Sequence, residues 1–226
     1  MRITTDTVRG GLAPVLLLAG MLAGCAESPE DDAKAPATAQ ATGAKGTAAR
    51  SGGTIGAAGS ACELPVTFAL AKRWKAKAVH AGAASSASSG SDGELAGDLA
   101  DALLHQGPVT MACEIDAKPA GNIGFLRVWT GSPGDGDARS VLRAFVAAEG
   151  NTSKEKYRTF KAGGVSGVEV EYLYTSKLLD EVKKESAFAV ATSDGTVVLH
   201  LGGMDTEEHE EMLPAYELAK RTLRVA

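Results

Sequence analysis

The chain has 226 residues, of which 44% are hydrophobic, and its 28 acidic and 23 basic side chains give a net charge of −5. This mildly acidic balance does not favour nucleic acid or an anionic lipid surface as an electrostatic partner. The length allows one domain with additional segments.

Residues 1–24 have the pattern of a secretory signal peptide. Arg2 and Arg9 precede an apolar run from Leu12 to Leu22, and small residues follow it. A membrane-spanning helix needs about 20 apolar residues, and this run offers about half that number. The pattern therefore predicts a cleaved signal peptide and not a transmembrane anchor.

The segment Leu22-Ala23-Gly24-Cys25 resembles the lipobox of bacterial lipoproteins, in which diacylglycerol alkylates the cysteine before cleavage. The resemblance implies that Cys25 is the first mature residue and the site of lipid attachment. The lipid would hold the protein on the extracytoplasmic face of the cell membrane, because two acyl chains give stable anchoring. The alternative is a fully secreted protein in which Cys25 is coincidental.

Residues 25–61 are predicted to form a disordered tether. They are rich in Ala, Gly, Thr, Ser and Pro, and Ile55 is their only large apolar side chain. Such a segment buries too little surface to offset its ordering entropy. The first aromatic residue of the chain is Phe68, so the folded domain is predicted to span residues 62–226.

Cys62 and Cys113 remain once Cys25 is assigned to the lipid. In an oxidising compartment they are predicted to form a structural disulfide, the alternative being two free thiols. No Cys-x-x-Cys motif or Cys/His cluster indicates zinc. Closing a loop of about 50 residues should stabilise the fold by roughly 4 kcal/mol.

Hydrophobic periodicity and turn residues predict a series of strands and three helices in the folded part. The strands are expected over residues 66–70, 74–79, 109–115, 122–130, 157–161, 165–175, 186–192 and 196–201, and the helices over 93–106, 137–150 and from 206 onward. Pro214 is expected to kink or restart the last helix. Hairpins crossed by helices indicate an α+β layered sandwich with a mostly antiparallel central sheet.

Motifs for catalysis, metal or cofactor binding are missing from the sequence. Gly164-Val165-Ser166-Gly167 lacks the spacing of a nucleophile elbow, and Gly131–Gly136 lacks the lysine of a phosphate loop. His209 lacks the second histidine of a zincin helix. The sequence therefore predicts no catalytic residue, no metal and no cofactor.

The isolated histidines and acidic pairs have plain structural interpretations. His80, His105 and His200 stand alone in the sequence and are interpreted as structural or surface residues. The pairs Glu169/Glu171 and Asp180/Glu181 are interpreted as surface charges, since spacing does not show whether two carboxyl groups face each other across a cleft.

Four aromatic residues lie on or beside predicted strands: Trp74, Trp129, Tyr172 and Tyr174. The simpler interpretation places them in the core of the sheet. The alternative is that some line a groove between sheet and helix, where an apolar ligand or a segment of a partner binds.

The order of elements is similar to that of the PsbP-like sandwich fold. Leu64-Pro65-Val66-Thr67-Phe68 followed by Lys72-Arg73-Trp74 resembles its opening strand and turn, and the helix, hairpins and terminal helix after Gly136 follow its order. Actinobacterial lipoproteins of the LpqN kind share this architecture, as do plant photosystem extrinsic subunits and a nuclear-transport factor. Members act mainly as non-catalytic binding or assembly factors, which the resemblance implies here by analogy.

The leading functional hypothesis is a lipid-anchored, non-catalytic binding or assembly module for an envelope protein or lipid. One alternative is a cell-envelope hydrolase with a carboxylate site, and another is a structural or sensing lipoprotein. A concave apolar pocket would favour the first. Convergent carboxylates with perturbed pKa values in a cleft would favour the second, and a flat surface the third.

Overall fold

The computed structural model describes residues 48–80 and 104–226. The predicted signal peptide, Cys25, most of the predicted tether and the greater part of the helix expected over 93–106 lie outside the described residues. His105 and Gln106, at the end of that expected helix, form a short strand instead. Within the described ranges, neither helix combines the length and the apolar character that crossing a membrane requires.

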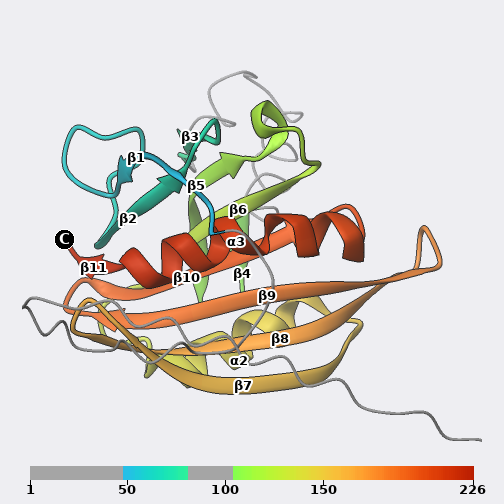
Figure 1. Cartoon of the computed structure of the whole chain (residues 1–226). Helices are drawn as coiled ribbons and strands as arrows, with labels where there is room; N and C mark the ends of the chain where they lie inside the picture. The colour runs from blue at the N-terminus through green and yellow to red at the C-terminus, as the bar shows by residue number, and fades with distance from the viewer. Residues whose placement is uncertain (1–47, 81–103) are drawn as a thin grey trace, which may run out of the picture. The chain divides into compact units, whose positions relative to one another are not determined.

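A large antiparallel sheet organises the described residues (Figure 1). Its strand order is β3-β5-β6-β10-β9-β8-β7, and β4 also pairs with β5. The strands are β3 Lys75–Ala78, β4 His105–Gln106, β5 Val109–Asp116, β6 Gly124–Thr130, β7 Thr152–Ala162, β8 Val165–Ser176, β9 Glu181–Thr192 and β10 Gly195–Gly203. The predicted α+β class with an antiparallel sheet is confirmed.

Helix α3, Thr206–Thr222, packs on one face of this sheet. Asp205 caps it by accepting a hydrogen bond from the backbone N–H of Glu208. The helix does not restart at Pro214, because Met212 and Tyr216 on either side are held in the core. A proline removes one backbone hydrogen bond, which this packing outweighs.

Helix α2, Ala138–Glu149, packs on the opposite face against β8, β9 and β10. The Asp137 side chain accepts hydrogen bonds from the backbone N–H groups of Arg139 and Ser140, as expected for an N-cap. The helix ends at Glu149. Beyond this residue the same face of the sheet carries no helix of the described residues.

The first strand shows that the predicted tether boundary at residue 61 is wrong. β1, Ser51–Ile55, pairs with β2, Val66–Ala71, and Ile55 enters the core. The glycines that suggested disorder are needed there, since a Cβ on Gly56 (φ +105°) would lie 1.9 Å from the carbonyl oxygen of Val66. Pairing through the backbone requires no large side chains, so the amino-acid composition of this segment did not predict the strand.

Cys62 and Cys113 form a disulfide with a Cα–Cα distance of 5.9 Å, which is the predicted pair. Both residues are buried. The bond joins the segment before β2 to β5 in the large sheet. β2 also pairs with β11, Arg224–Val225, so the small sheet has the order β1-β2-β11.

Candidate functional site

The four aromatic candidates separate between the two faces of the large sheet. Trp74 is buried in the core on the α3 face, as the simpler interpretation predicts. Trp129 and Tyr172 belong to the core cluster on the α2 face, and Tyr174 packs against that cluster. Three of the four candidates therefore gather on one face, and the C-terminal end of α2 is beside them.

A cavity of about 450 Å³ opens on this face at the C-terminal end of α2, and we call it the α2-end cavity. Apolar and charged groups both line it. The apolar group consists of Ile123, Phe125, Trp129, Tyr174 and Met204, and the charged or titratable group of Arg127, Glu149, Lys183, Glu185 and His200. The two groups are interleaved, because Lys183 Nζ lies 5.4 Å from the centre of the Tyr174 ring and the guanidinium carbon of Arg127 lies 4.7 Å from that of Phe125.

The base of the cavity holds a cluster around the hydroxyl of Tyr172. This oxygen lies 2.6 Å from Glu149 Oε2, 3.2 Å from Glu185 Oε2 and 3.1 Å from His200 Nε2. Tyr172 on β8 stands opposite Glu185 on β9, while Glu149 is the last residue of α2. Four separate elements therefore bring these side chains together.

Ion pairs engage both carboxylate oxygens of Glu185. Oε1 lies 2.7 Å from Lys183 Nζ, and Oε2 lies 2.7 Å from His200 Nε2. Glu185 is only 2% exposed, so this buried charge is compensated by direct partners. Arg127, also in the cavity wall, pairs with Glu114 at 2.9 Å.

The two carboxyl groups have opposite pKa shifts. Burial raises the pKa of Glu149 to about 7, and the negative charge of Glu185 adds to the effect. Burial also opposes ionisation of Glu185, but the charge and hydrogen bond of His200 prevail and lower its pKa. Glu185 is thus ionised at neutral pH, whereas the raised pKa of Glu149 favours its protonated form.

The pKa values of His200 and Tyr172 are also shifted, and they determine the remaining charges of the cluster. Burial disfavours the imidazolium form of His200, yet the charge and hydrogen bond of Glu185 outweigh it and raise the pKa of His200. Burial and the two carboxylates raise the pKa of Tyr172. The cluster therefore contains a neutral phenol beside a Glu185–His200 ion pair.

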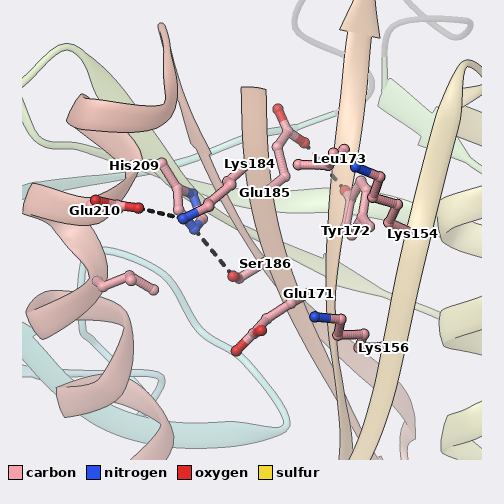
Figure 2. Close-up of a pocket in the computed structure, with 11 residues that line it drawn as sticks. Lys154, Lys156, Glu171, Tyr172, Leu173, Lys184, Glu185, Ser186, His209 and Glu210 are labelled. Atoms are coloured by element: carbon pink, nitrogen blue, oxygen red, sulfur yellow. Dashed lines mark hydrogen bonds and ion pairs between the residues drawn. The ribbon is translucent and has the colours of Figure 1, made fainter. Parts of the chain in front are cut away.

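A second pocket, of about 300 Å³, lies near the N-terminal part of α3 (Figure 2). Its charged side chains are mostly paired: Lys184 bonds Glu210, and His209 Nε2 lies 3.1 Å from the Ser186 hydroxyl. Burial lowers the pKa of His209 to about 4, so this histidine is neutral. Ser186 and His209 line this pocket, and each is 2% exposed.

Comparison with known proteins places the chain in a family. Residues 32–223 match the profile of a family described as "Uncharacterised lipoprotein". The chain belongs to this lipoprotein family. No curated protein matches it.

Among solved structures, that of cyanobacterial PsbP (CyanoP) from Synechocystis sp. PCC 6803, determined in solution, is similar to this lipoprotein. The sequences are 12% identical and the TM-score is 0.48. The similarity covers 83% of this chain and 98% of the cyanobacterial chain.

Sequence reasoning missed Glu149, Glu185 and His200 in this lipoprotein. His200 was interpreted as an isolated histidine, but hairpin register places it opposite Ala187, diagonal to Glu185 on the same face. This diagonal placement in the predicted hairpin was the sequence signal that could have indicated a contact between His200 and Glu185. No sequence signal indicated Glu149, because only the packing of α2 brings this residue to the sheet.

Proposed function

We propose that this lipoprotein is a non-catalytic binding module of the cell envelope, anchored through Cys25 on the extracytoplasmic face of the membrane. The α2-end cavity is its ligand site, and the ligand is an envelope lipid or a segment of an envelope protein. Membership of a lipoprotein family supports the anchor. The narrower relationship to actinobacterial, LpqN-like proteins is part of the same proposal.

The observation that carries this proposal is the mixed lining of the cavity, which combines apolar and charged side chains. Tyr174 and Met204 offer apolar contact, and Met204 is 52% exposed. Lys183 and the Glu149 carboxyl group offer polar contact at the base. Pockets for small ligands combine these two features, and the arrangement suits a ligand with an apolar body and a polar group.

The engagement of Glu185 supports a non-catalytic role. Its two oxygens are held by Lys183 and His200, so a role as nucleophile or general base would require one of these ion pairs to break. Glycosidases place two carboxyl groups about 5–9.5 Å apart with the sugar between them. In this cluster one oxygen of Glu149 and one of Glu185 lie within 4.8 Å of each other, and the hydroxyl of Tyr172, not a sugar, contacts both carboxyl groups.

Native mass spectrometry of the chain solubilised from its own membrane tests the proposal. The wild-type protein should carry a lipid or peptide adduct. Gly202→Leu should lose it, since a Cβ on Gly202 meets no atom closer than 3.4 Å and the rest of the side chain fills the cavity that this glycine lines. Lys75→Leu, on exposed β3, should keep it. An absent adduct, or one that Gly202→Leu retains, would overturn the proposal.

One observation favours hydrolysis as a second candidate function. Glu149, with a pKa near 7, lines a cavity beside the ionised Glu185, which separates a proton donor from an acceptor. A hydrolase should release products from cell-envelope glycans, and Glu149→Gln should abolish turnover while keeping the fold. Absence of turnover by wild-type protein that carries its adduct would exclude this candidate.

A further inference from the structure

We infer that Glu149, Glu185 and His200 form a binding site for a divalent transition-metal cation, and that Zn²⁺ is the ion their chemistry fits. The inference deepens the proposed function and rests on it, because it names a ligand for the base of the α2-end cavity. It contradicts the expectation from sequence that the protein binds no metal.

The ligand set comes from three elements. One atom each from Glu149, Glu185 and His200 can be chosen so that all lie within 4.8 Å of one another. Zn²⁺ binds carboxylate oxygen and imidazole nitrogen at about 2.0–2.2 Å, which sets two tetrahedral ligands roughly 3.3–3.6 Å apart. Side-chain movements of about 1 Å therefore bring the three atoms to bonding distance. The imidazole favours a transition metal over Ca²⁺ or Mg²⁺, which prefer oxygen ligands. Binding releases the Nε2 proton of His200 and the carboxyl proton of Glu149 to solvent, because a metal takes neutral imidazole and ionised carboxylate as ligands.

Tyr172 places a hydroxyl group in the same space. Its oxygen is within 3.2 Å of all three ligand side chains. Structural zinc sites are almost always four-coordinate. Three protein ligands and a bound water give this number, and the phenol of Tyr172 is placed to hydrogen-bond that water.

Lys183 orients the carboxylate of Glu185. Its ammonium group holds Oε1 at 2.7 Å, which leaves Oε2 facing His200. Hydrogen bonds of this outer kind commonly orient metal-binding carboxylates. The charge of Lys183 opposes a cation and lowers its affinity, whereas the charge of Arg127 is balanced by Glu114.

The cluster is accessible from the cavity. Glu149, Glu185 and His200 all line it. Gly202 lies beside them, because a Cβ there would be 3.4 Å from His200 Cε1 and 3.8 Å from Glu185 Oε1. A glycine at this position keeps the approach to the two side chains open.

An independent feature of the same cavity also indicates a ligand. Trp129 lines it and is 4% exposed, and its indole N–H has no hydrogen-bond acceptor in the described part of the chain. Buried donors of this kind are nearly always paired in native proteins. A water or anionic group bound to the cation would provide an acceptor for this donor.

Zinc titration of the full chain in detergent, stripped with EDTA, tests the inference. Competition against a chromogenic chelator should show one Zn²⁺ per chain. Glu149→Gln and His200→Asn should each weaken binding at least about tenfold. Glu210→Gln, which changes an exposed glutamate beside His209, should bind as wild type does. Circular dichroism checks folding, and the half-buried Glu149 keeps the test valid if His200→Asn does not fold.

Substoichiometric binding, or equal affinity in wild type and Glu149→Gln, would overturn the inference as adventitious binding. The failure of the inference and that of the proposed function are distinguishable. Zn²⁺ binding in a chain that carries no adduct would support the metal site and overturn the proposed function. An adduct sensitive to Gly202→Leu in a chain that does not bind Zn²⁺ would support the proposed function and overturn the metal site.

Discussion

The buried charges under the α2-end cavity depend on small differences between neighbouring side chains. Glu149 and Glu185 contact the same tyrosine hydroxyl, yet only Glu185 has Lys183 and His200 as ion-pair partners. Burial therefore controls the protonation of Glu149, and the partners control that of Glu185. Only side-chain positions in the folded chain reveal this difference.

Glu149 makes stability depend on pH. Its folded pKa is raised from 4.5 to about 7, so its contribution is complete below about pH 4.5 and is lost as pH rises through 7. Glu149→Gln does not titrate and should gain stability relative to wild type at high pH, by up to about 3 kcal/mol. Urea denaturation of both proteins at about pH 5 and about pH 8 measures this difference. Parallel pH profiles would contradict the assignment.

At the scale of elements, the alternation of apolar and polar side chains predicted most strands of the large sheet. Strands with apolar alternation, such as β8 with Val168, Val170 and Tyr172, were predicted near their observed bounds. β1 was not, because four of its five residues are exposed and its pairing is through the backbone. The cluster under the α2-end cavity was not predicted for a related reason. Strand register and the packing of α2 bring its residues together, and neither appears as a pattern of side chains along the sequence.

The close approach of Gly56, the residue after β1, to Val66 of β2 gives a prediction at this scale. Gly56→Ala should destabilise the fold by more than about 1–3 kcal/mol, because its Cβ would overlap the carbonyl oxygen of Val66 and its φ is +105°. Gly59→Ala is the matched control: its φ is +76°, but no atom lies within 4 Å of the new Cβ. Thermal melting should therefore show the larger decrease for Gly56→Ala. Equal decreases would mean that β1 does not pack as described.

At the scale of the molecule, the disulfide joins two parts of the fold that are 51 residues apart in sequence. Reduction, or Cys113→Ser with Cys62→Ser, should lower the free energy of unfolding by roughly 4 kcal/mol and leave the fold class unchanged. Melting with and without reductant measures the loss, and far-ultraviolet circular dichroism checks the fold. Two reactive thiols in the denatured, unreduced protein would show that the bond does not form.

The anchor gives the second prediction at this scale. Cys25→Ser should move the protein from the membrane fraction to the soluble or unprocessed pool, because no thiol remains for the lipid. Fractionation followed by mass measurement of the N-terminus checks both location and processing. A processed variant that stays with the membrane would disprove lipid attachment at Cys25.

The disulfide also determines how mechanical tension travels through the protein. A pull applied through the N-terminal segment first reaches the hydrogen bonds between β1 and β2. At Cys62 it crosses by a covalent bond to Cys113 in β5, and β5 pairs directly with β6, which carries Trp129 in the cavity wall. Residues 63–112 lie outside this shortest path. Under the proposed function, tension between the anchor and the ligand in the α2-end cavity would therefore bypass residues 63–112.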